Sequence, residues 1–597
     1  MMRSSRYAIG LAVLLSASAW LPAPASRAQG PAVQPAWIAV SNRYAQPLLE
    51  LQARYEPESA ARWGVTGLDD QVSQFPVDRP ARFKADTQSV IDRLRRQLAS
   101  EKDAHLAQDL RIMIKSADDM LKDAALSEKY DLPYFNPSQM IFGGIRSLLD
   151  DQVPENRRKA ALVRLRKYTG VEPGYEPLTA QLQARAHDWA HRGQLGPAKV
   201  RLDTNLARSD FFINGIGDLF AKYKMDGYQE PFARLKTQIV DYNAWVGRDI
   251  MPKARADFRL PAEEYALSLS EIGVDIPSGQ LAAMAHKAFA EYQVEIDSLA
   301  SQIAKARGLS ATDYRAVIAE LKKDQLPGDA ILSHYQRRLG DIEAIVRREH
   351  LVTLPDRPAR IRLATPAETA QQPAPHMVPP PLLNNTGEQG EFVLPLNVPT
   401  QPGSADTKRI DDFTFAAASW TLTSHEARPG HELQFAAMVE RGVSLARSLF
   451  AFNSVNVEGW GLYAEHIMKP YEPLDGQLIA LQLHLLRAAR AFIDPELQSG
   501  RLTPADAMRI LTHDVMLSEA FANTEVERYT FQAPGQATSY FYGYTRLLEL
   551  RKDAEARLGK HFDQQRYHDF IISQGLLPPN LLRQAVMDEF VRAELSR

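Results

Sequence analysis

The stretch 278-SGQLAAMAHKAFAEYQVEIDSLASQIAKARG-308 indicates the fold class of this chain. Its apolar side chains recur at steps of three and four residues, the spacing of one face of an α-helix, and Gly308 stands where such a helix would stop. We therefore expect one amphipathic helix of about eight turns over 278–307. Alternation typical of strands is scarce, so a mainly α fold is predicted. The same helical periodicity appears around 36–55, 81–99, 104–124, 228–248, 328–349, 476–494 and 536–558.

One stretch interrupts the helical pattern, from Pro355 to Pro402, where eleven of the chain's 38 prolines fall. Within it, Arg360–Leu363 and Glu391–Leu394 have the composition of short strands. A loop of this length is either a linker, which would split the chain into two domains near 350–410, or a functional element. The functional interpretation is a small β element around 355–402 whose edge borders a central cleft.

The N-terminus has the pattern of a secretory signal peptide. Arg3 and Arg6 precede an apolar run that ends at Trp20, and a small-residue stretch follows that fits cleavage after Ala28, with Ala25 as the alternative. The apolar run is shorter than the ~20 residues that span a bilayer, and no later segment supplies 18 consecutive apolar residues. We expect residues 1–28 to be removed and the mature chain to be exported, periplasmic or secreted, without stable membrane insertion.

Composition narrows the possible functions. The 597 residues include 70 Lys and Arg against 73 Asp and Glu, a formal charge of −3, so there is no basic surplus for a nucleic-acid partner. The chain contains no cysteine, which excludes disulfides, thiolate metal sites, Fe–S clusters and a cysteine nucleophile. Any metal site is therefore confined to His, Asp, Glu and water. The sequence leaves the oligomeric state open.

The chemistry is concentrated in 423-TSHEARPGHELQ-434, which follows the proline-rich stretch. In the familiar H-E-x-x-H helix, two histidines four positions apart bind zinc on one face, and the glutamate between them acts as general base. Here His425 is followed by Glu426, but the second histidine, His431, comes six positions after the first. On a regular helix the two histidines would point about 120° apart, so the simple motif fails as written.

Two interpretations of this spacing remain open. Pro429 disrupts the preceding helical turn and Gly430 accepts unusual dihedral angles, so a two-residue bulge could return His431 to the face of His425. On an unbroken helix, Glu432 would instead lie about 20° from His425 and would be the competing ligand.

A third ligand is expected downstream, and Glu458 is the best candidate, 27 residues after His431. Glu465 follows it by seven positions, hence on the same helix face. Two histidines and one carboxylate leave a coordination position open for water, which is the arrangement of a catalytic zinc site. The alternative is that both glutamates lie on a solvated helix face and that the two histidines are unconnected.

These motifs together resemble a known family, the bacterial "domain of unknown function 885" proteins, predicted metallopeptidases of the gluzincin kind. The resemblance extends to the region near the mature N-terminus and so covers essentially the whole mature chain. It rests on H-E-A-x-P-G-H at 425–431 followed by Leu433-Gln434, on Glu458-Gly459-Trp460 through Glu465, on Pro534-Gly535-Gln536-Ala537 with Tyr540, Gly543 and Arg551, and weakly on Pro57 through Gly67.

The resemblance implies a large, mostly helical metallopeptidase-like fold. It implies His425 and His431 as zinc ligands, Glu458 as the third ligand and Glu426 as the base. The family commonly has a second histidine directly after the motif, where this chain has Glu432. We expect one such domain over 29–597, with a helical N-terminal lobe at about 31–350 and a catalytic part at about 351–597.

A cluster after Pro534 offers groups that could assist catalysis. Tyr540, the tyrosine that matches the family motif, could donate a hydrogen bond to a developing oxyanion, and Arg551 or Arg546 could bind a substrate carboxylate. His376 could reach the substrate if the proline-rich stretch borders the cleft. Three further acids could orient a ligand histidine, although their spacing selects none of them: Glu519, Glu525 and Glu527.

The favoured prediction is a zinc-dependent peptidase in which metal and Glu426 activate water and zinc with Tyr540 stabilises the oxyanion. In this interpretation Glu391–Leu394 is an edge strand that binds the substrate backbone. The alternative is a non-catalytic periplasmic binding or scaffold protein with a structural metal or none. The position of Glu426 between two would-be ligands argues against the alternative, because a structural site has no need of a general base.

Overall fold

The computed structural model of the protein describes residues 35–189, 192–399 and 407–597. The predicted signal peptide, residues 1–28, lies outside these residues. The remainder, from Pro35 to Arg597, forms one compact unit. The division into lobes at about residue 350 stays a prediction.

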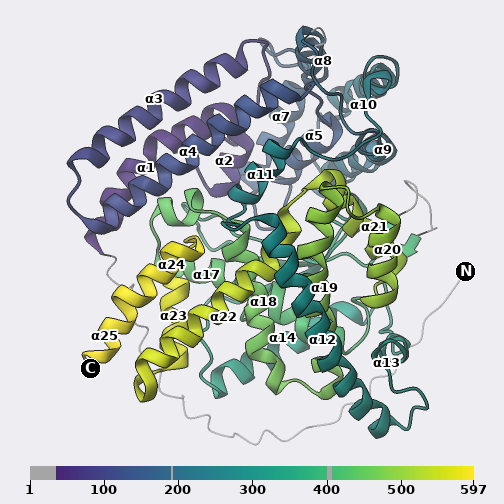
Figure 1. Ribbon diagram of the computed structural model, residues 1–597. Helices are drawn as coiled ribbons and strands as arrows, with labels where there is room; N and C mark the ends of the chain where they lie inside the picture. The colour runs from purple at the N-terminus through teal and green to yellow at the C-terminus, as the bar shows by residue number, and fades with distance from the viewer. Residues whose placement is uncertain (1–34, 190–191, 400–406) are drawn as a thin grey trace, which may run out of the picture. The chain divides into compact units, whose positions relative to one another are not determined.

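The described chain is mainly helical, which confirms the predicted fold class (Figure 1). The helices before the proline-rich stretch are α1 (Ala36–Tyr55), α2 (Pro57–Trp63), α3 (Arg79–Ser100), α4 (Ala104–Tyr130), α5 (Pro137–Arg146), α6 (Glu155–Arg158), α7 (Ala160–Tyr168), α8 (Leu178–Trp189), α9 (Lys199–Lys222), α10 (Gln229–Trp245), α11 (Ala262–Glu271), α12 (Ser278–Arg307), α13 (Tyr314–Leu321) and α14 (Ile331–Arg348). Those after β1 are α15 (Pro366–Gln371), α16 (Ala418–Glu426), α17 (His431–Arg441), α18 (Ser454–Met468), α19 (Leu474–Gln498), α20 (Pro504–Arg509), α21 (Glu519–Glu527), α22 (Ser539–Leu558), α23 (Gln564–Ser573), α24 (Pro579–Ala585) and α25 (Val591–Leu595).

The helices predicted from periodicity are all present. The one predicted over 278–307 is α12, which begins after Pro277 and ends before Gly308. The other predicted ranges correspond to α1, α3, α4, α10, α14, α19 and α22. No helix among the described residues combines the length and apolar character needed to cross a bilayer.

The proline-rich stretch carries a three-stranded sheet, in the order β1 (Arg360–Leu363), β3 (Glu391–Leu394), β2 (His376–Val378). β3 runs parallel to β1 and antiparallel to β2, and it is buried along its whole length. Both predicted strands are thus confirmed. The expected edge position of Glu391–Leu394 is wrong, because β1 and β2 occupy the two sides of β3. A second, two-stranded sheet pairs β4 (Asn397–Pro399) with β5 (Thr407–Arg409).

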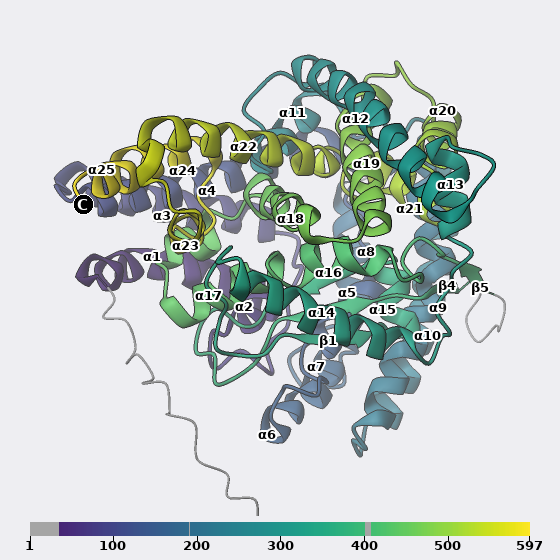
Figure 2. The same ribbon diagram turned by 90° about the horizontal axis from the view of Figure 1, so that it is seen from below.

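Two helix pairs, α12 with α19 and α18 with α22, pack along each other (Figures 1 and 2). Phe392 and Leu394 of β3 belong to the same buried apolar cluster as residues of α12 and α19. The sheet is therefore part of the core and does not link separate parts. A second cluster joins Leu48 and Leu110, near the start of the described chain, to Trp460 of α18. Each fully buried large apolar side chain contributes about 1.5–3 kcal/mol.

Candidate metal centre

The segment that holds the two histidines is a pair of helices joined by a short turn. α16 ends at Glu426, the chain turns over Ala427–Gly430, and α17 begins at His431. A Cβ on Gly430 would lie 1.9 Å from the His425 carbonyl oxygen, so only glycine fits this approach. The Trp460 Nε1–H donates a 3.0 Å hydrogen bond to the Pro429 carbonyl and anchors the turn to α18. We expected a two-residue bulge at Pro429-Gly430 within one helix. The structure instead has a complete break between two helices at this point.

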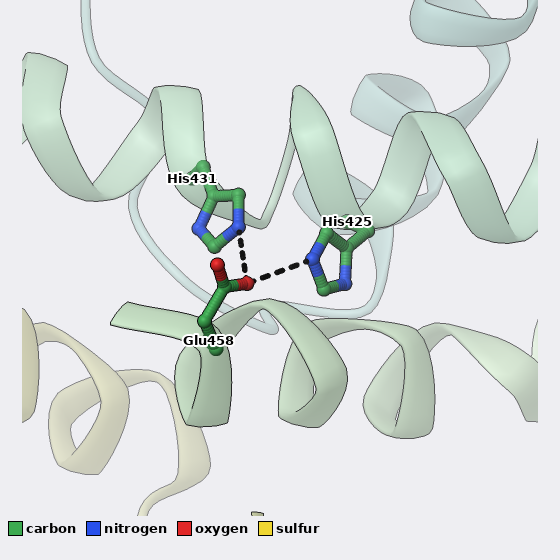
Figure 3. A group of neighbouring side chains, drawn as sticks. All are labelled: His425, His431 and Glu458. Carbon is green, nitrogen blue, oxygen red and sulfur yellow. Dashed lines mark ion pairs between the residues drawn. The ribbon is translucent and has the colours of Figure 1, made fainter. Parts of the chain in front are cut away.

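This turn brings His425 and His431 together, with Glu458 of α18 facing them (Figure 3). Glu458 Oε2 lies 3.5 Å from His425 Nε2 and 3.3 Å from His431 Nε2. The imidazole planes meet at 83°, with ring centroids 4.6 Å apart. One potential ligand atom from each of the three residues lies within 4.8 Å of the others. The three residues predicted as ligands thus form one cluster.

The two imidazole rings pack against α18 at Gly461, where there is no room for a side chain. A Cβ on Gly461 would lie 2.6 Å from His425 Cε1 and 2.9 Å from His431 Cε1. Gly461 is three positions after Glu458 on α18, so the helix that supplies the carboxylate also makes room for the histidines. Helix interiors disfavour glycine, and the close approach of the rings explains its use here.

The second nitrogen of His425 is held by a buried carboxylate. Glu465 Oε1 lies 2.7 Å from His425 Nδ1, and Glu465 also accepts hydrogen bonds from Thr421 at 2.5 Å and Arg487 at 3.1 Å. Burial would raise the pKa of Glu465, but the Arg487 cation and the bond from His425 lower it to about 2. An ionised carboxylate only accepts hydrogen bonds, so the proton of a neutral His425 is on Nδ1 and the Nε2 lone pair faces Glu458.

The donor set fits a divalent metal ion. Glu458 Oε2 is buried and has no hydrogen-bond partner among the described residues, although two imidazole nitrogens lie within 3.5 Å of it. Burial would raise the pKa of Glu458, yet His425 and His431 hold it well below its ordinary value. Two imidazole nitrogens and one carboxylate oxygen around a common point are a ligand set typical of zinc.

The cluster opens into a cavity of about 350 Å³, whose walls include Glu426, Tyr540 and His376. Glu426 is 8% exposed, and burial raises the pKa of its carboxyl group, which suits a general base. The Tyr540 ring stacks near His425, with ring centroids 6.1 Å apart and an angle of 17° between the planes. His376 comes from β2, so the sheet of the proline-rich stretch borders the cavity as the functional interpretation predicted.

Other predicted residues lie away from this cavity. Arg551 contacts Glu555, Gln564 and the Tyr463 hydroxyl, and Arg546 pairs with Glu549. Neither arginine is among the residues that line the cavity, and their substrate-binding role stays a prediction. Glu432 accepts a 2.7 Å hydrogen bond from the buried Arg428 and is not part of the metal cluster.

Sequence reasoning missed the residue that orients the ligand histidine and the arginines of the cavity. Glu465, and none of Glu519, Glu525 and Glu527, bonds to His425. Its signal was the seven-residue spacing from Glu458. The cavity is lined by Arg487 and Arg490 of α19 and by Arg528. For Arg487 and Arg490, the signal was a pair of arginines three positions apart inside the largely apolar helix predicted over 476–494.

Comparisons with known proteins agree with this fold. The model of a family described as "Bacterial protein of unknown function (DUF885)" matches residues 57–586. The crystal structure of a "putative lipoprotein" from Colwellia psychrerythraea is similar with a TM-score of 0.72 and 18% identity, over 93% of this chain and 99% of that one. A "putative lipoprotein of unknown function" from Shewanella oneidensis gives a TM-score of 0.67 and 19% identity, over 93% and 100% of the chains. No curated protein matches.

Proposed function

The chain belongs to the bacterial DUF885 family, and from its metal-ligand cluster we propose that it is a zinc-dependent hydrolase that cleaves peptide bonds. The observation that carries the proposal is the convergence of His425, His431 and Glu458 on the wall of a cavity that also contains Glu426. A three-residue ligand set of this kind leaves a position open, as catalytic zinc sites do.

His425, His431 and Glu458 would hold the ion, and Glu465 orients His425. When bound, zinc supplies Lewis acidity that makes a water molecule acidic enough to attack a carbonyl carbon near neutral pH. Glu426 accepts the proton from that water and passes it to the leaving amine nitrogen. Its raised pKa favours both transfers, because a base with a pKa nearer neutrality also serves as an acid.

Tyr540 is the proposed donor to the oxyanion that develops on the scissile carbonyl. Arg528 Nη1 donates to the Tyr540 oxygen at 3.4 Å, so the phenol hydrogen is free to point elsewhere. Burial raises the pKa of Tyr540, which keeps the phenol protonated at neutral pH. A donor placed beside a ligand histidine stabilises negative charge more strongly than it would in water.

A peptide is the proposed substrate because an edge strand borders the cavity. β2 occupies the edge of the three-stranded sheet, and His376 and Met377 of β2 line the cavity. An extended peptide can add to such an edge through main-chain hydrogen bonds.

We also propose that the protein acts outside the cytoplasm, periplasmic or secreted. The N-terminal sequence pattern supports this proposal, as do two structurally similar proteins described as lipoproteins.

The test is elemental analysis of purified protein combined with a mixed-peptide cleavage assay, on the parent and on Glu426→Gln and His431→Ala. We expect about one zinc per chain in the parent, zinc but no cleavage with Glu426→Gln, and no zinc with His431→Ala. A parent that binds no metal in zinc-replete buffer would contradict the proposal and favour a non-catalytic binding protein.

A further inference from the structure

Three arginines form one wall of the cavity that holds the metal-ligand cluster. Arg487 and Arg490 lie on the same face of α19, and Arg528 follows directly after α21. The three side chains are 5–15% exposed, so little solvent reaches their charges. Buried guanidinium groups need anionic partners, because an unpaired charge in a low-dielectric site is costly.

Two of these arginines are paired with carboxylates of the protein. Arg490 donates to both oxygens of Glu525 at 2.7 and 2.8 Å, and Arg487 donates to Glu465 at 3.1 Å. Burial would raise the pKa of Glu525, but the Arg490 and Arg528 guanidinium groups lower it to about 2, so this carboxylate is charged.

Arg528 has no carboxylate of its own among the described residues. The Glu525 oxygen beside it is 3.8 Å away and is the one that already accepts from Arg490 Nη2. Among the described side chains, Arg528 donates its one hydrogen bond to the Tyr540 hydroxyl. Three guanidinium groups therefore share two carboxylates. The remaining acids of the cavity, Glu426 and Glu458, belong to the candidate metal centre.

The Tyr540 ring lies close to both Arg528 and the metal-ligand cluster. The Arg528 guanidinium is 5.9 Å from the centroid of the Tyr540 ring, and the same centroid is 6.1 Å from that of the His425 ring. One residue of extended chain covers about 3.3–3.6 Å, and a hydrogen bond at each end adds about 2.8 Å. These distances are compatible with a carboxylate bound at Arg528 whose preceding peptide carbonyl reaches the metal-ligand cluster.

We infer that Arg528, within the Arg487–Arg490–Arg528 wall, binds the free carboxylate at the C-terminus of a peptide, so that the enzyme releases C-terminal residues one at a time. The inference rests on the proposed function. Water adds to the last peptide carbonyl, the C–N bond breaks, and Glu426 moves the proton of the water to the amine nitrogen. The products are a shortened peptide with a new carboxylate and one free amino acid.

Apolar side chains of α19 and α21 line the cavity beside the arginines and would surround the C-terminal side chain of the substrate. Leu483 and Leu486 share the cavity-facing side of α19 with Arg487 and Arg490, and Phe521 of α21 also lines the cavity. Phe413 stacks edge-on against Phe521 with ring centroids 4.8 Å apart. We expect a preference for a large apolar C-terminal side chain.

The first experiment uses zinc-loaded protein of unchanged sequence and three blocked dipeptides: benzoyl-Gly-Phe, its C-terminal amide, and benzoyl-Gly-Glu amide. We expect kcat/KM for the free acid to exceed that for either amide by about 100-fold, the usual cost of losing one partner of a buried charge pair. Equal cleavage of acid and amide would overturn the inference while leaving the proposed hydrolase intact. Efficient cleavage of the Glu amide would mean that the cavity recognises an acidic side chain and not the C-terminal carboxylate. That result would also overturn the inference.

The second experiment does not depend on activity. Calorimetry on chelator-treated protein compares N-acetyl-phenylalanine with N-acetyl-phenylalaninamide, and we expect the acid to bind at least about tenfold more tightly. Arg528→Gln should abolish the difference and Arg528→Lys should keep part of it. Arg441→Gln should leave it unchanged, because Arg441 is a part-buried arginine paired with Asp569 outside the cavity. If zinc-loaded protein cleaves none of the three peptides, the proposed function fails. Equal binding of acid and amide would then also overturn the carboxylate site.

Discussion

Glu465 lies on the side of the His425 imidazole opposite Glu458: its Oε1 is 2.7 Å from Nδ1, while Glu458 Oε2 is 3.5 Å from Nε2. In the proposed metal centre, His425 would thus lie between a carboxylate that fixes its tautomer and a carboxylate that binds the same ion. A carboxylate that bonds to the second nitrogen of a ligand histidine raises the basicity of the histidine and fixes its orientation.

We expect Glu465→Gln to weaken zinc binding by about 10- to 100-fold, because loss of such a partner leaves the ligand less basic and less well oriented. Competition with a chromogenic chelator measures the affinity. The unfolding free energy should be measured alongside, since Arg487 loses its carboxylate partner in the same variant. Unchanged zinc affinity in a folded variant would show that His425 does not bind metal through Nε2.

Gly461→Ala should remove metal binding without removing any ligand. The new Cβ would overlap the Cε1 atoms of His425 and His431, so both rings must move. Zinc stoichiometry is the measurement. Gly340→Ala is the matched control, because Gly340 lies within α14 with open space around its Cβ position, and we expect that change to stabilise the protein by about 0.5–1 kcal/mol. Full zinc occupancy in Gly461→Ala would contradict the arrangement in Figure 3.

Zinc should raise the melting temperature of chelator-treated protein. An ion that binds only the folded chain stabilises it by about 2.7 kcal/mol at a free concentration 100 times Kd. We expect the shift in the parent and in Glu426→Gln, and none in His431→Ala or Glu458→Ala. Calorimetric scans over a series of zinc concentrations test this, and an equal shift in His431→Ala would place the bound ion elsewhere.

The protein should lose stability in mild acid through His568. This histidine is fully buried, with Nε2 2.8 Å from the Tyr463 hydroxyl and Nδ1 2.7 Å from the Leu351 carbonyl, and burial lowers its pKa to about 3. The unfolded chain takes up the proton near pH 6.5, well before the folded protein does. The free energy of unfolding therefore falls as the pH drops from about 6.5 toward 3, by an amount on the order of a few kcal/mol.

Urea unfolding at a series of pH values in this window measures the effect. We expect His568→Gln to be less stable than the parent at pH 7 but to lose less stability on acidification. His513→Gln, which alters an exposed histidine, should follow the parent. Parallel pH profiles for His568→Gln and the parent would mean that His568 is not the group that takes up the proton.

Periodicity was sufficient to predict most of the long helices, because each keeps one apolar face toward the core, but α9 (Lys199–Lys222) was missed. Composition identified β1 and β3, but their order in the sheet depends on a third strand, and β2 is too short to show alternation. The three residues of the candidate metal cluster could be named from their types and spacing. The arginines of the cavity could not, because their position depends on how α19 packs against α16 and α22, and Arg551, whose spacing matched the family motif, bonds to Tyr463 instead.

Because of the turn between α16 and α17, the sequence spacing of the two histidines does not have to match the pitch of one helix. With Ala427–Gly430 in place, two histidines six positions apart reach the same point, although helical geometry alone would require a spacing of four. A pattern search for H-E-x-x-H passes over this chain. Adding or deleting one residue within the turn should be as damaging as replacing a ligand, since the register between the two helices is itself part of the site.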